Sequence, residues 1–428
     1  MLQSVAVTAA DAHRAIDAVW RIESPRLIAG LTRIVRDVGL AEELAQDALV
    51  AAVEQWPESG VPDNPGAWLM ATAKHRAIDR LRRDARLERK QEEIGRELEA
   101  ARKMATAVPE GGGDFGDDLL RLVFIACHPV LSTEARVALT LRLLGGLSTD
   151  EIARAFLVPE PTIAQRIVRA KRTLTAAHVP FEVPAAGDLE ARLGSVLEVI
   201  YLVFNEGYSA TAGDDWMRPA LCLDALRLGR LVAELLPHEP EAHGLVALME
   251  IQASCTRARV GPAGEPILLL DQNRGQWDPL LIRRGLTALE RAEALGGALG
   301  PYALQAAIAA CHARARTPEE TDWPQIAALY DALAQIADSP VVELNRAVAY
   351  GMAFGPAAGL ELADALVAEP SLRSYHLLPS VRGDLLAKLG RSDEARSEFE
   401  RAAALTRNAR ERELLLERAA ACPRGKKE

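Results

Sequence analysis

The sequence predicts an all-α protein with two small helical domains, a flexible linker between them, and a long helical extension. The second small domain is expected to contain a helix-turn-helix. The chain has 428 residues, which is too long for one small core. It is rich in Ala and Leu and only 4% aromatic, a composition that favours helices over β-sandwiches or barrels. Apolar side chains also recur at spacings of three and four behind helix-capping residues.

The first helical pattern runs from Ala10 to Trp56 and breaks between Arg36 and Leu40. In the segment from Leu40 to Trp56, small and apolar residues follow one side of the helix and acidic residues lie largely elsewhere. An acidic rim of this kind is usually a solvated face. The alternative is a docking face for a basic partner, and its members are Glu42, Glu43, Gln46, Asp47 and Glu54.

A second element begins after a loop predicted for Pro57 to Asp63. Asn64 can cap a helix whose first residue is Pro65, since proline lacks an N–H that would be unpaired there. Residues 66–90 hold eight basic and three acidic side chains, so positive charge is concentrated on this helix. A cationic track beside an aromatic side chain, Trp68, suits single-stranded DNA, although Trp68 alone reads as a core residue.

A flexible linker is expected at Ala105 to Asp118 because this stretch is rich in Pro, Gly and Asp. Leu131 to Leu174 then reads as three short helices, of which the last two form a helix-turn-helix. Ser132 can cap the first helix, and Gly145-Gly146 can end it. Ser148 and Glu151 have the spacing of a capping box for the second, and a turn follows at Leu157 to Glu160.

The third helix of this unit is predicted for Pro161 to Leu174. It carries four basic residues and no acidic one, which suits the major groove of DNA because Arg and Lys neutralise phosphates. Thr162 and Gln165 lie near its start, where side chains can reach base edges. The alternative is an ordinary helical hairpin with a solvated basic face.

The composition argues against several other classes of protein. A net charge of -10 does not suit a protein that coats nucleic acid along its whole surface. The five cysteines form no CxxC pair, so no disulfide framework, zinc site or other cofactor is expected. No stretch has the length and apolar character of a membrane span, and no leader is visible, so the chain is expected in the cytoplasm without a membrane partner.

These segments, in this order, resemble an extracytoplasmic-function (ECF) sigma factor, a bacterial RNA polymerase specificity subunit with two conserved globular domains. The polymerase-binding helix of this family resembles LAEELAQDALVAAVEQWP. The helix that reads and melts the near promoter element resembles NPGAWLMATAKHRAIDRLRRD. The domain that reads the far promoter element resembles the segment from Leu131 to Leu174. The resemblance implies a sigma domain two at 10–90, a linker at 91–117 and a sigma domain four at 118–178.

Carried over by position, the resemblance also implies site residues. Family members commonly have an acidic residue where Leu40 stands and an Asn where His75 stands, so this chain departs from the pattern at both. Core polymerase would be bound by Glu43, Gln46 and Asp47. Promoter DNA would be bound by Asn64, Trp68, Arg76, Asp79, Arg80, Arg82 and Arg83 at the near element, and by Thr162, Gln165, Arg166, Arg169, Lys171 and Arg172 at the far element.

Residues 186–428 exceed what a minimal sigma factor needs and read as successive helices, starting with Leu189 to Phe204. Further helices are predicted from Asp278-Pro279, from Tyr302 and at Pro324 to Ile336. A repeat 37 positions long resembles tetratricopeptide (TPR) helical pairs, and sigma factors with such extensions form a subgroup. The repeated positions are Ala358, Leu362, Ala365 and Pro370, then Ala395, Phe399, Ala402 and Arg407.

Two segments of the extension are unusually specific, Tyr201 to Thr211 and Leu269 to Asp278, because each combines aromatics, an amide or acid, and Gly. They could form a contact within the protein or a pocket for a small regulator. The acidic pair Asp214-Asp215 lacks a nucleophile and base at recognisable spacing, so no enzyme activity is predicted.

The function predicted from these patterns is promoter-specific transcription initiation with core RNA polymerase and promoter DNA as partners. The extension is expected to regulate this activity, through an intramolecular contact or a protein partner, in place of or beside a separate anti-sigma protein. The competing function is a polymerase-independent helix-turn-helix regulator or adaptor with a helical-repeat interaction domain.

Overall fold

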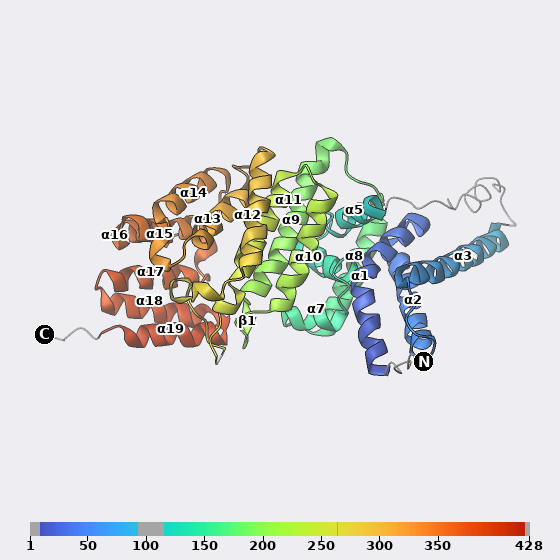
Figure 1. Cartoon of the computed structure of the whole chain (residues 1–428), viewed down its shortest axis with the longest axis horizontal. Coiled ribbons are helices and arrows are strands. Elements are labelled where there is room, and N and C mark those ends of the chain that lie inside the picture. Colours follow the sequence, from blue (N-terminus) through green and yellow to red (C-terminus); the bar gives the residue numbers. More distant parts are fainter. Residues whose placement is uncertain (1–8, 93–114, 263, 424–428) are drawn as a thin grey trace, which may run out of the picture. The chain divides into compact units, whose positions relative to one another are not determined.

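The computed structural model describes residues 9–92, 115–262 and 264–423, and nearly all of its regular structure is helical (Figure 1). The chain divides into two compact units, Met1–Val199 and Ile200–Glu428. The predicted all-α fold is confirmed. Most of the linker predicted at 91–117 lies outside the described residues.

The first unit contains the two small helical domains and the beginning of α9, and its helices start and end close to the predicted positions. Arg36 takes a left-handed φ of 54°, and the Asp37 carboxylate then accepts the Leu40 N–H at 2.7 Å, which produces the predicted break. The helices are α1 (Ala9–Val35), α2 (Val38–Ser59), α3 (Pro65–Glu92), α5 (Phe115–Ala126), α6 (Thr133–Leu143), α7 (Thr149–Phe156), α8 (Glu160–Ala176) and α9 (Ala186–Tyr208).

The loop predicted from Pro57 begins later than expected, because α2 continues through Pro57 to Ser59. Trp56 is only 1% exposed, so the last turn is fixed by its packing in the core. A proline in the final turn removes one backbone donor, which is a smaller cost than exposing the indole would be. Gly60 ends the helix with a φ of 82° and donates its N–H to the Trp56 carbonyl at 2.9 Å.

The predicted helix-turn-helix is present as α6, α7 and α8. Ser132 caps α6, and Ser148 forms the predicted capping box with Glu151 at the start of α7. Leu157 adopts a left-handed φ of 51° at the turn, where glycine or asparagine would be the usual residue. The third helix is slightly longer than predicted and opens at Glu160, with proline as its second residue.

The second unit consists of packed helices and one very short parallel strand pair, β1 (Ala212–Gly213) with β2 (Arg407–Asn408). Its helices are α10 (Pro219–Leu235), α11 (Pro240–Ser254), α12 (Pro279–Ala294), α13 (Pro301–Arg314), α14 (Trp323–Ile336), α15 (Pro340–Phe354), α16 (Pro356–Ala365), α17 (Leu377–Lys388), α18 (Ser392–Leu405) and α19 (Ala409–Ala421). Single 3-10 turns lie at Thr256–Ala258, Leu269–Asp271, Arg274–Gln276, Pro318–Glu320 and Pro370–Leu372. The helices predicted in this region are confirmed.

The internal repeat is visible in α16 and α18, but its register differs by one residue from the predicted period of 37. In α18 the repeated positions Ala395, Phe399 and Ala402 are all buried, whereas α16 buries Gly359 and Ala363 and exposes Ala365. The equivalent buried positions are therefore 36 residues apart. The small residue in α16 is Gly359, where a Cβ would lie 2.5 Å from the carbonyl oxygen of α15 residue Ala347.

Candidate nucleic-acid interface

Helix α3 has one buried stripe and one basic, exposed side. Leu69, Ala73 and Ala77 are buried, with exposed fractions of 1% or less. Asn64 caps the helix by accepting the Ala67 N–H at 3.0 Å, so it fixes where the helix begins. The predicted DNA-contacting residues Asp79, Arg80, Arg82 and Arg83 are exposed or partly exposed, as is His75, and Arg76 is half-buried. The basic side can therefore follow a nucleic-acid backbone.

Trp68 lies at the edge of the core instead of standing free on the surface. Its ring meets the buried Trp56 ring edge-on, with 5.3 Å between centroids and 68° between planes. The side chain is half-buried, so part of it remains open beside the exposed loop residues Gly60, Asp63 and Asn64. The core packing suggested by the sequence is thus observed for part of this side chain, and contact with a base stays a prediction.

The predicted polymerase-binding residues lie on α2 directly beside α3. Glu43 and Asp47 are exposed, whereas Gln46 donates to the Glu42 carboxylate at 2.6 Å. Arg76 of α3 donates to the Asp47 backbone carbonyl at 2.8 Å and lies 3.6 Å from its carboxylate. The structure thus brings one predicted polymerase-binding residue, Asp47, into contact with one predicted near-element residue, Arg76.

Helix α8 buries Ile163, Ile167, Ala170 and Leu174 and turns its polar residues outward. Thr162, Gln165, Arg169 and Arg172 are exposed, and Arg166 is half-buried. The buried apolar side packs the helix against α6 and α7, and the polar side leaves Thr162 and Gln165 accessible near the N-terminal end. It is the arrangement that reading base edges in the major groove requires.

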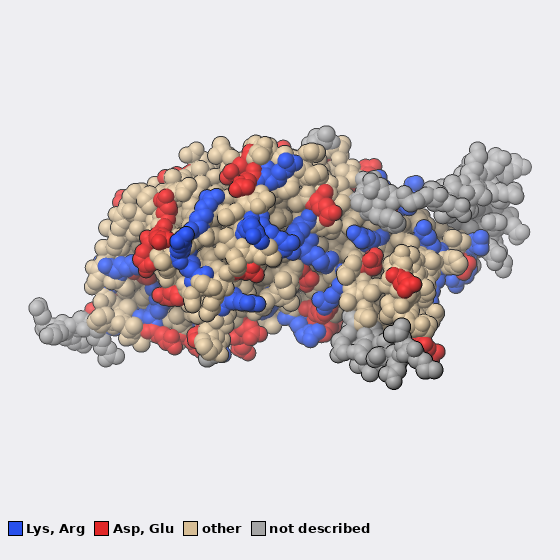
Figure 2. Space-filling model, viewed as in Figure 1, with Lys and Arg blue, Asp and Glu red and all other residues tan. Residues whose placement is uncertain are grey.

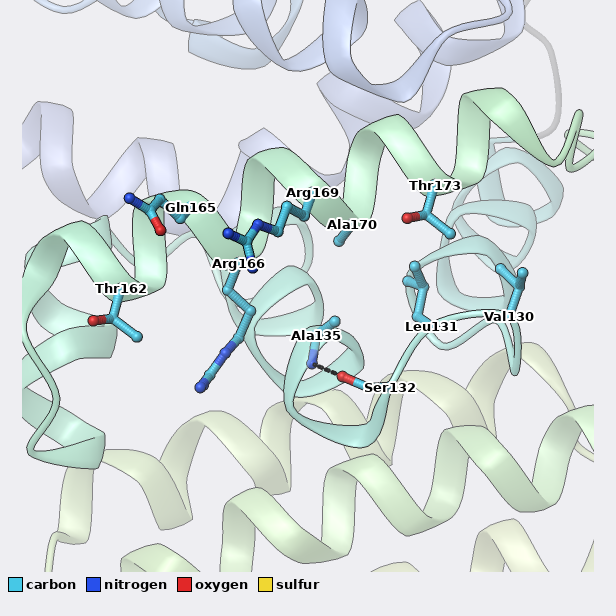
Figure 3. Close-up of a pocket in the computed structure, with 10 residues that line it drawn as sticks. All are labelled: Val130, Leu131, Ser132, Ala135, Thr162, Gln165, Arg166, Arg169, Ala170 and Thr173. Carbon is cyan, nitrogen blue, oxygen red and sulfur yellow. Dashed lines mark hydrogen bonds between the residues drawn. The ribbon is translucent and has the colours of Figure 1, made fainter.

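A hollow of about 350 Å³ lies between α8 and the N-terminus of α6 (Figure 3). Arg166 and Arg169 extend along it from α8, and Ser132 lies at its other side. The pKa of Glu134, in the first turn of α6, is lowered by its own backbone N–H, by the Ser132 hydroxyl and by the nearby Arg166. A helix N-terminus and two guanidinium groups favour negative charge, and the Glu134 carboxylate supplies one such charge at this helix start.

Lys171 differs from the other predicted DNA-binding residues. Its ammonium group contacts the Glu42 carboxylate of α2, and only 20% of its side chain is exposed. Arg142 of α6 reaches the same carboxylate at 2.6 Å. In this structure Lys171 therefore lies away from the open side of α8. The sequence analysis did not predict that Glu42 pairs with Arg142 and Lys171, because these residues are separated by a hundred or more positions along the chain.

The two distinctive segments of the extension pack into one cluster of side chains. Tyr208 from the first segment and Trp277 from the second lie around Cys255 and Ala258. The Tyr208 hydroxyl is 3.3 Å from the Cys255 thiol, and the Arg259 guanidinium stacks 3.6 Å from the centre of the Tyr208 ring. The contact within the protein that the sequence suggested is thus observed.

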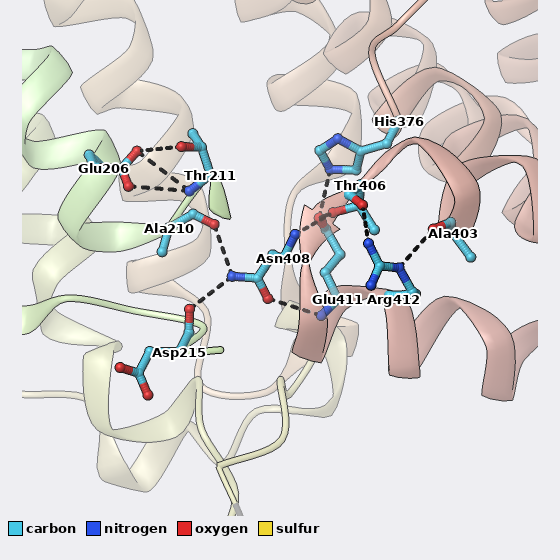
Figure 4. A network of polar contacts seen from close by, with 10 residues as sticks. All are labelled: Glu206, Ala210, Thr211, Asp215, His376, Ala403, Thr406, Asn408, Glu411 and Arg412. Atoms are coloured by element: carbon cyan, nitrogen blue, oxygen red, sulfur yellow. Dashed lines mark hydrogen bonds and ion pairs between the residues drawn. The ribbon is translucent and has the colours of Figure 1, made fainter. Parts of the chain in front are cut away.

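A second contact ties the first segment to the end of the chain (Figure 4). The side-chain amide of Asn408 donates to the Ala210 carbonyl at 3.1 Å and to the Asp215 carbonyl at 2.8 Å. Its oxygen accepts the Glu411 N–H at 3.2 Å and caps α19. On the face drawn in Figure 2, basic and acidic side chains are interspersed over the extension.

The five cysteines are free and buried, and burial raises the pKa of the Cys127 thiol to about 11. Within the described residues no three His, Cys, Asp or Glu side chains are grouped so that they could hold a metal ion. None of the helices in residues 9–92, 115–262 and 264–423 combines the length and apolar character needed to cross a lipid bilayer.

Comparisons with protein families match three regions of the chain. The Sigma-70 region 2 family matches residues 20–87, which lie in α1 to α3. The Sigma-70, region 4 family matches residues 121–174, which lie in α5 to α8. A family of unknown function, DUF6596, matches residues 192–293 in the extension.

Individual relatives agree with this division. An uncharacterized protein of Rhizobium meliloti is 44% identical over 397 residues, which are 92% of this chain and 93% of that protein. The probable ECF RNA polymerase sigma factor SigI of Mycobacterium tuberculosis is 23% identical over 41% of this chain and 59% of its own length. The ECF RNA polymerase sigma factor SigK of Mycobacterium ulcerans is 28% identical over 34% of this chain and 75% of its own length. No solved structure matches the chain significantly.

The order of the matched regions agrees with the helices that carry the basic and acidic surfaces described above. Region 2 contains the acidic side of α2 and the basic side of α3, and region 4 contains α8. The matches to SigI and SigK cover 41% and 34% of the chain, and the DUF6596 match lies in the extension. The chain belongs to the ECF sigma factors and carries a long helical extension after its sigma regions.

Proposed function

We propose that this sigma factor binds core RNA polymerase through α2 and directs it to a promoter through α3 and α8. Residues 10–90 would act at the polymerase and the near promoter element, residues 118–178 at the far element, and residues 186–428 as a regulatory domain. The observation that supports this most strongly is the contact between Asp47 and Arg76, which joins the acidic side of α2 to the basic side of α3. The relatives SigI and SigK, described as ECF RNA polymerase sigma factors, support the choice of partner. The place of action would be the cytoplasm, where polymerase and chromosome meet.

At the near element, the proposed chemistry is recognition of a melted strand. Arg80, Arg82 and Arg83 would neutralise phosphates along the exposed side of α3, and this part of the affinity would fall with salt. Trp68 and the loop ending at Asn64 would hold an unstacked base, because an aromatic ring accepts any base by stacking.

At the far element, Thr162 and Gln165 would contact base edges, where a good bidentate contact gives about 1 to 3 kcal/mol of discrimination. Arg166, Arg169 and Arg172 would bind phosphates. A single recognition helix is a weak reader, but tethering it to α3 and to polymerase makes its binding effectively intramolecular.

The extension is proposed to regulate these interactions through α9. The first part of α9 is fixed to the far-element domain: Arg192 donates to the Phe124 carbonyl at 2.9 Å, and Ser195 donates to the Cys127 carbonyl at 2.8 Å. Arg136 of α6 also pairs with Glu198 at 3.2 Å. Since α9 continues into the extension, a change in the extension could reach the domain that carries α8.

The test of the proposed function is binding of core RNA polymerase, followed by run-off transcription from the upstream region of the gene. The intact chain is expected to bind and to give a transcript with a defined start, and Asp47→Arg is expected to abolish both. Glu43→Arg tests the same side of α2 without touching the contact with Arg76. Glu361→Arg, an exposed site on α16, is a control with the same change of charge.

The competing function makes opposite predictions. A polymerase-independent regulator would bind duplex DNA tightly on its own and would be indifferent to Asp47→Arg. Strong DNA binding without polymerase, combined with an unaffected Asp47→Arg variant, would therefore replace the proposal with that function.

The regulatory role is tested by two truncations. A chain ending at residue 184 loses all of α9, whereas one ending at residue 199 keeps the part that packs on Phe124 and Cys127. Promoter output or polymerase affinity should change in the 199-residue chain if the extension regulates. Unchanged values in that chain would reject regulation, and a defect limited to the 184-residue chain would show that α9 has only a structural role.

A further inference from the structure

The hollow between α8 and the start of α6 has a cationic end and an apolar end (Figure 3). Arg166 and Arg169 extend from α8 at the cationic end. Val130 and Leu131, which precede α6, line the apolar end. Val130 is 43% exposed, so a branched apolar side chain lies open to solvent there. A ligand that fits both ends must itself have a charged part and an apolar part.

The positive charge of the cationic end is only partly neutralised. Glu134 lies near Arg166 and supplies one negative charge at the start of α6. Among the residues that the structure describes, Arg169 forms no ion pair with a carboxylate. Thr162 and Gln165 add a hydroxyl and an amide at the same end. A carboxylate is therefore favoured beside Arg169, because a guanidinium can donate two parallel hydrogen bonds to it.

The size of the hollow limits its occupant to a small molecule. Its volume of about 350 Å³ lies at the lower end of the range for ligand pockets. One turn of an α-helix, about 10 Å across and about 5.4 Å long, would need more than this volume. A peptide helix is thus too large, whereas a short carbon chain with one carboxylate fits both the volume and the two ends.

The hollow shares residues with the surface proposed to read the far promoter element. Four residues belong to both, Thr162, Gln165, Arg166 and Arg169. A DNA phosphate would pair with a guanidinium but offers no carbon chain to the apolar end. DNA binding therefore does not account for the apolar end, and an occupant of the whole hollow would cover side chains that DNA needs.

We propose that the hollow binds a small amphiphilic carboxylate, and that the bound molecule prevents α8 from contacting the far promoter element. The carboxylate would pair with Arg169, and the carbon chain would pack on Val130, Leu131 and Ala135. This inference rests on the proposed function, because it takes α8 as the reader of the far element. A molecule of this chemical class would lower transcription directly at the reading helix, without any change in the extension.

The length of the carbon chain gives the expected size of the effect. Burying one more methylene favours binding by about fourfold, so affinity should rise from butanoate to hexanoate to octanoate. A hydrogen bond to a charged group contributes about tenfold or more, so Arg169→Gln should weaken octanoate binding by at least about tenfold. Octylamine, which has the same chain and the opposite charge, should not bind.

The first experiment measures octanoate binding to the full chain by titration calorimetry, without polymerase. Ala135→Leu fills the hollow, and Val130→Asn makes its apolar end polar. Neither residue belongs to the proposed DNA-binding set, and two variants guard against a folding defect in either one. Ala357→Leu on α16 and Val341→Asn on α15 are the matched controls at exposed positions.

The second experiment measures promoter binding by the complex with core polymerase while octanoate is added. Competition predicts that the apparent dissociation constant for the promoter rises about twofold when the octanoate concentration equals its own dissociation constant, and in proportion above it. Ala135→Leu should bind the promoter like the native chain and should be insensitive to octanoate. Octylamine at the same concentrations controls for effects of the carbon chain alone.

The outcomes separate this site from the function on which it rests. Octanoate binding that grows with chain length, is weakened by both hollow variants but by neither control, and lowers promoter affinity supports the site. Absence of binding to the native chain, or equal binding by the native chain and both hollow variants, overturns it. Octanoate that binds without lowering promoter affinity overturns the competition with DNA. If the native chain fails to bind polymerase or promoter in the absence of octanoate, the proposed function fails, while the calorimetry still decides whether the hollow binds a carboxylate.

Discussion

Replacing Asn408 by Ala should destabilise the extension by removing three hydrogen bonds at once. Asn408 is 1% exposed and joins residues that lie about two hundred positions apart in the chain (Figure 4). Its side chain serves the Ala210 and Asp215 carbonyls and also the Glu411 N–H at the start of α19. Alanine leaves all three backbone groups without this partner.

The magnitude follows from the three hydrogen bonds. Each net hydrogen bond contributes about 1 kcal/mol to stability, and loss of an N-cap also costs about 1 kcal/mol. The free energy of unfolding of the extension should therefore fall by about 2 to 4 kcal/mol. For a unit of this size, that corresponds to a lower melting temperature by roughly 4 to 16 °C.

Calorimetry on the intact chain measures this shift, and hydrogen exchange of the α19 amides locates it. Asn345→Ala is the control, since Asn345 is exposed in the middle of α15. A melting temperature for Asn408→Ala within about 1 °C of the control would refute the reasoning, because at this size 1 °C is well under 1 kcal/mol. It would mean that water replaces the lost contacts at little cost.

Three other predictions follow from particular residues. Gly359→Ala should lower the free energy of unfolding, because a Cβ there would lie 2.5 Å from a carbonyl oxygen of α15. Gly194→Ala, where a Cβ would meet nothing, should raise it by about 0.5 to 1 kcal/mol. Thermal melting of the two variants measures both changes. Burial and the nearby Arg274 lower the pKa of His312 from 6.5 to about 4, so the unfolded chain takes up its proton first as pH falls. Stability should then decrease from about pH 6.5 to about pH 4, by at most about 3 kcal/mol, and His312→Gln should remove this dependence in urea titrations. Arg169→Ala should weaken promoter binding by the polymerase complex for all far-element sequences alike and reduce the slope of log affinity against log salt by about one.

Much of the helical architecture is predictable because helix ends depend on neighbouring residues. Ser148 with Glu151, Asn64 and Asp278 each satisfy backbone N–H groups two or three positions away, and the sequence predicts all three helix starts. The loop predicted for Pro57 to Asp63 starts only at Gly60, since the packing of Trp56 in the core outweighs the local preference for a loop at Pro57. The predicted repeat is one residue off because only packing shows that Gly359 is the small position.

The sequence by itself determined the fold class, the family and the basic and acidic character of α2, α3 and α8, because composition, caps and helical spacing are local properties. Only the tertiary structure decided which of these charges are open. Glu42 and Lys171 have the same local signatures as Glu43 and Arg172, yet they lie buried against each other across 129 positions. The pairing of Asn408 with Ala210 is equally invisible in the sequence. Partners brought together by long-range packing leave no periodic trace, since a hydrogen bond or ion pair constrains the distance between two side chains and not their separation along the chain.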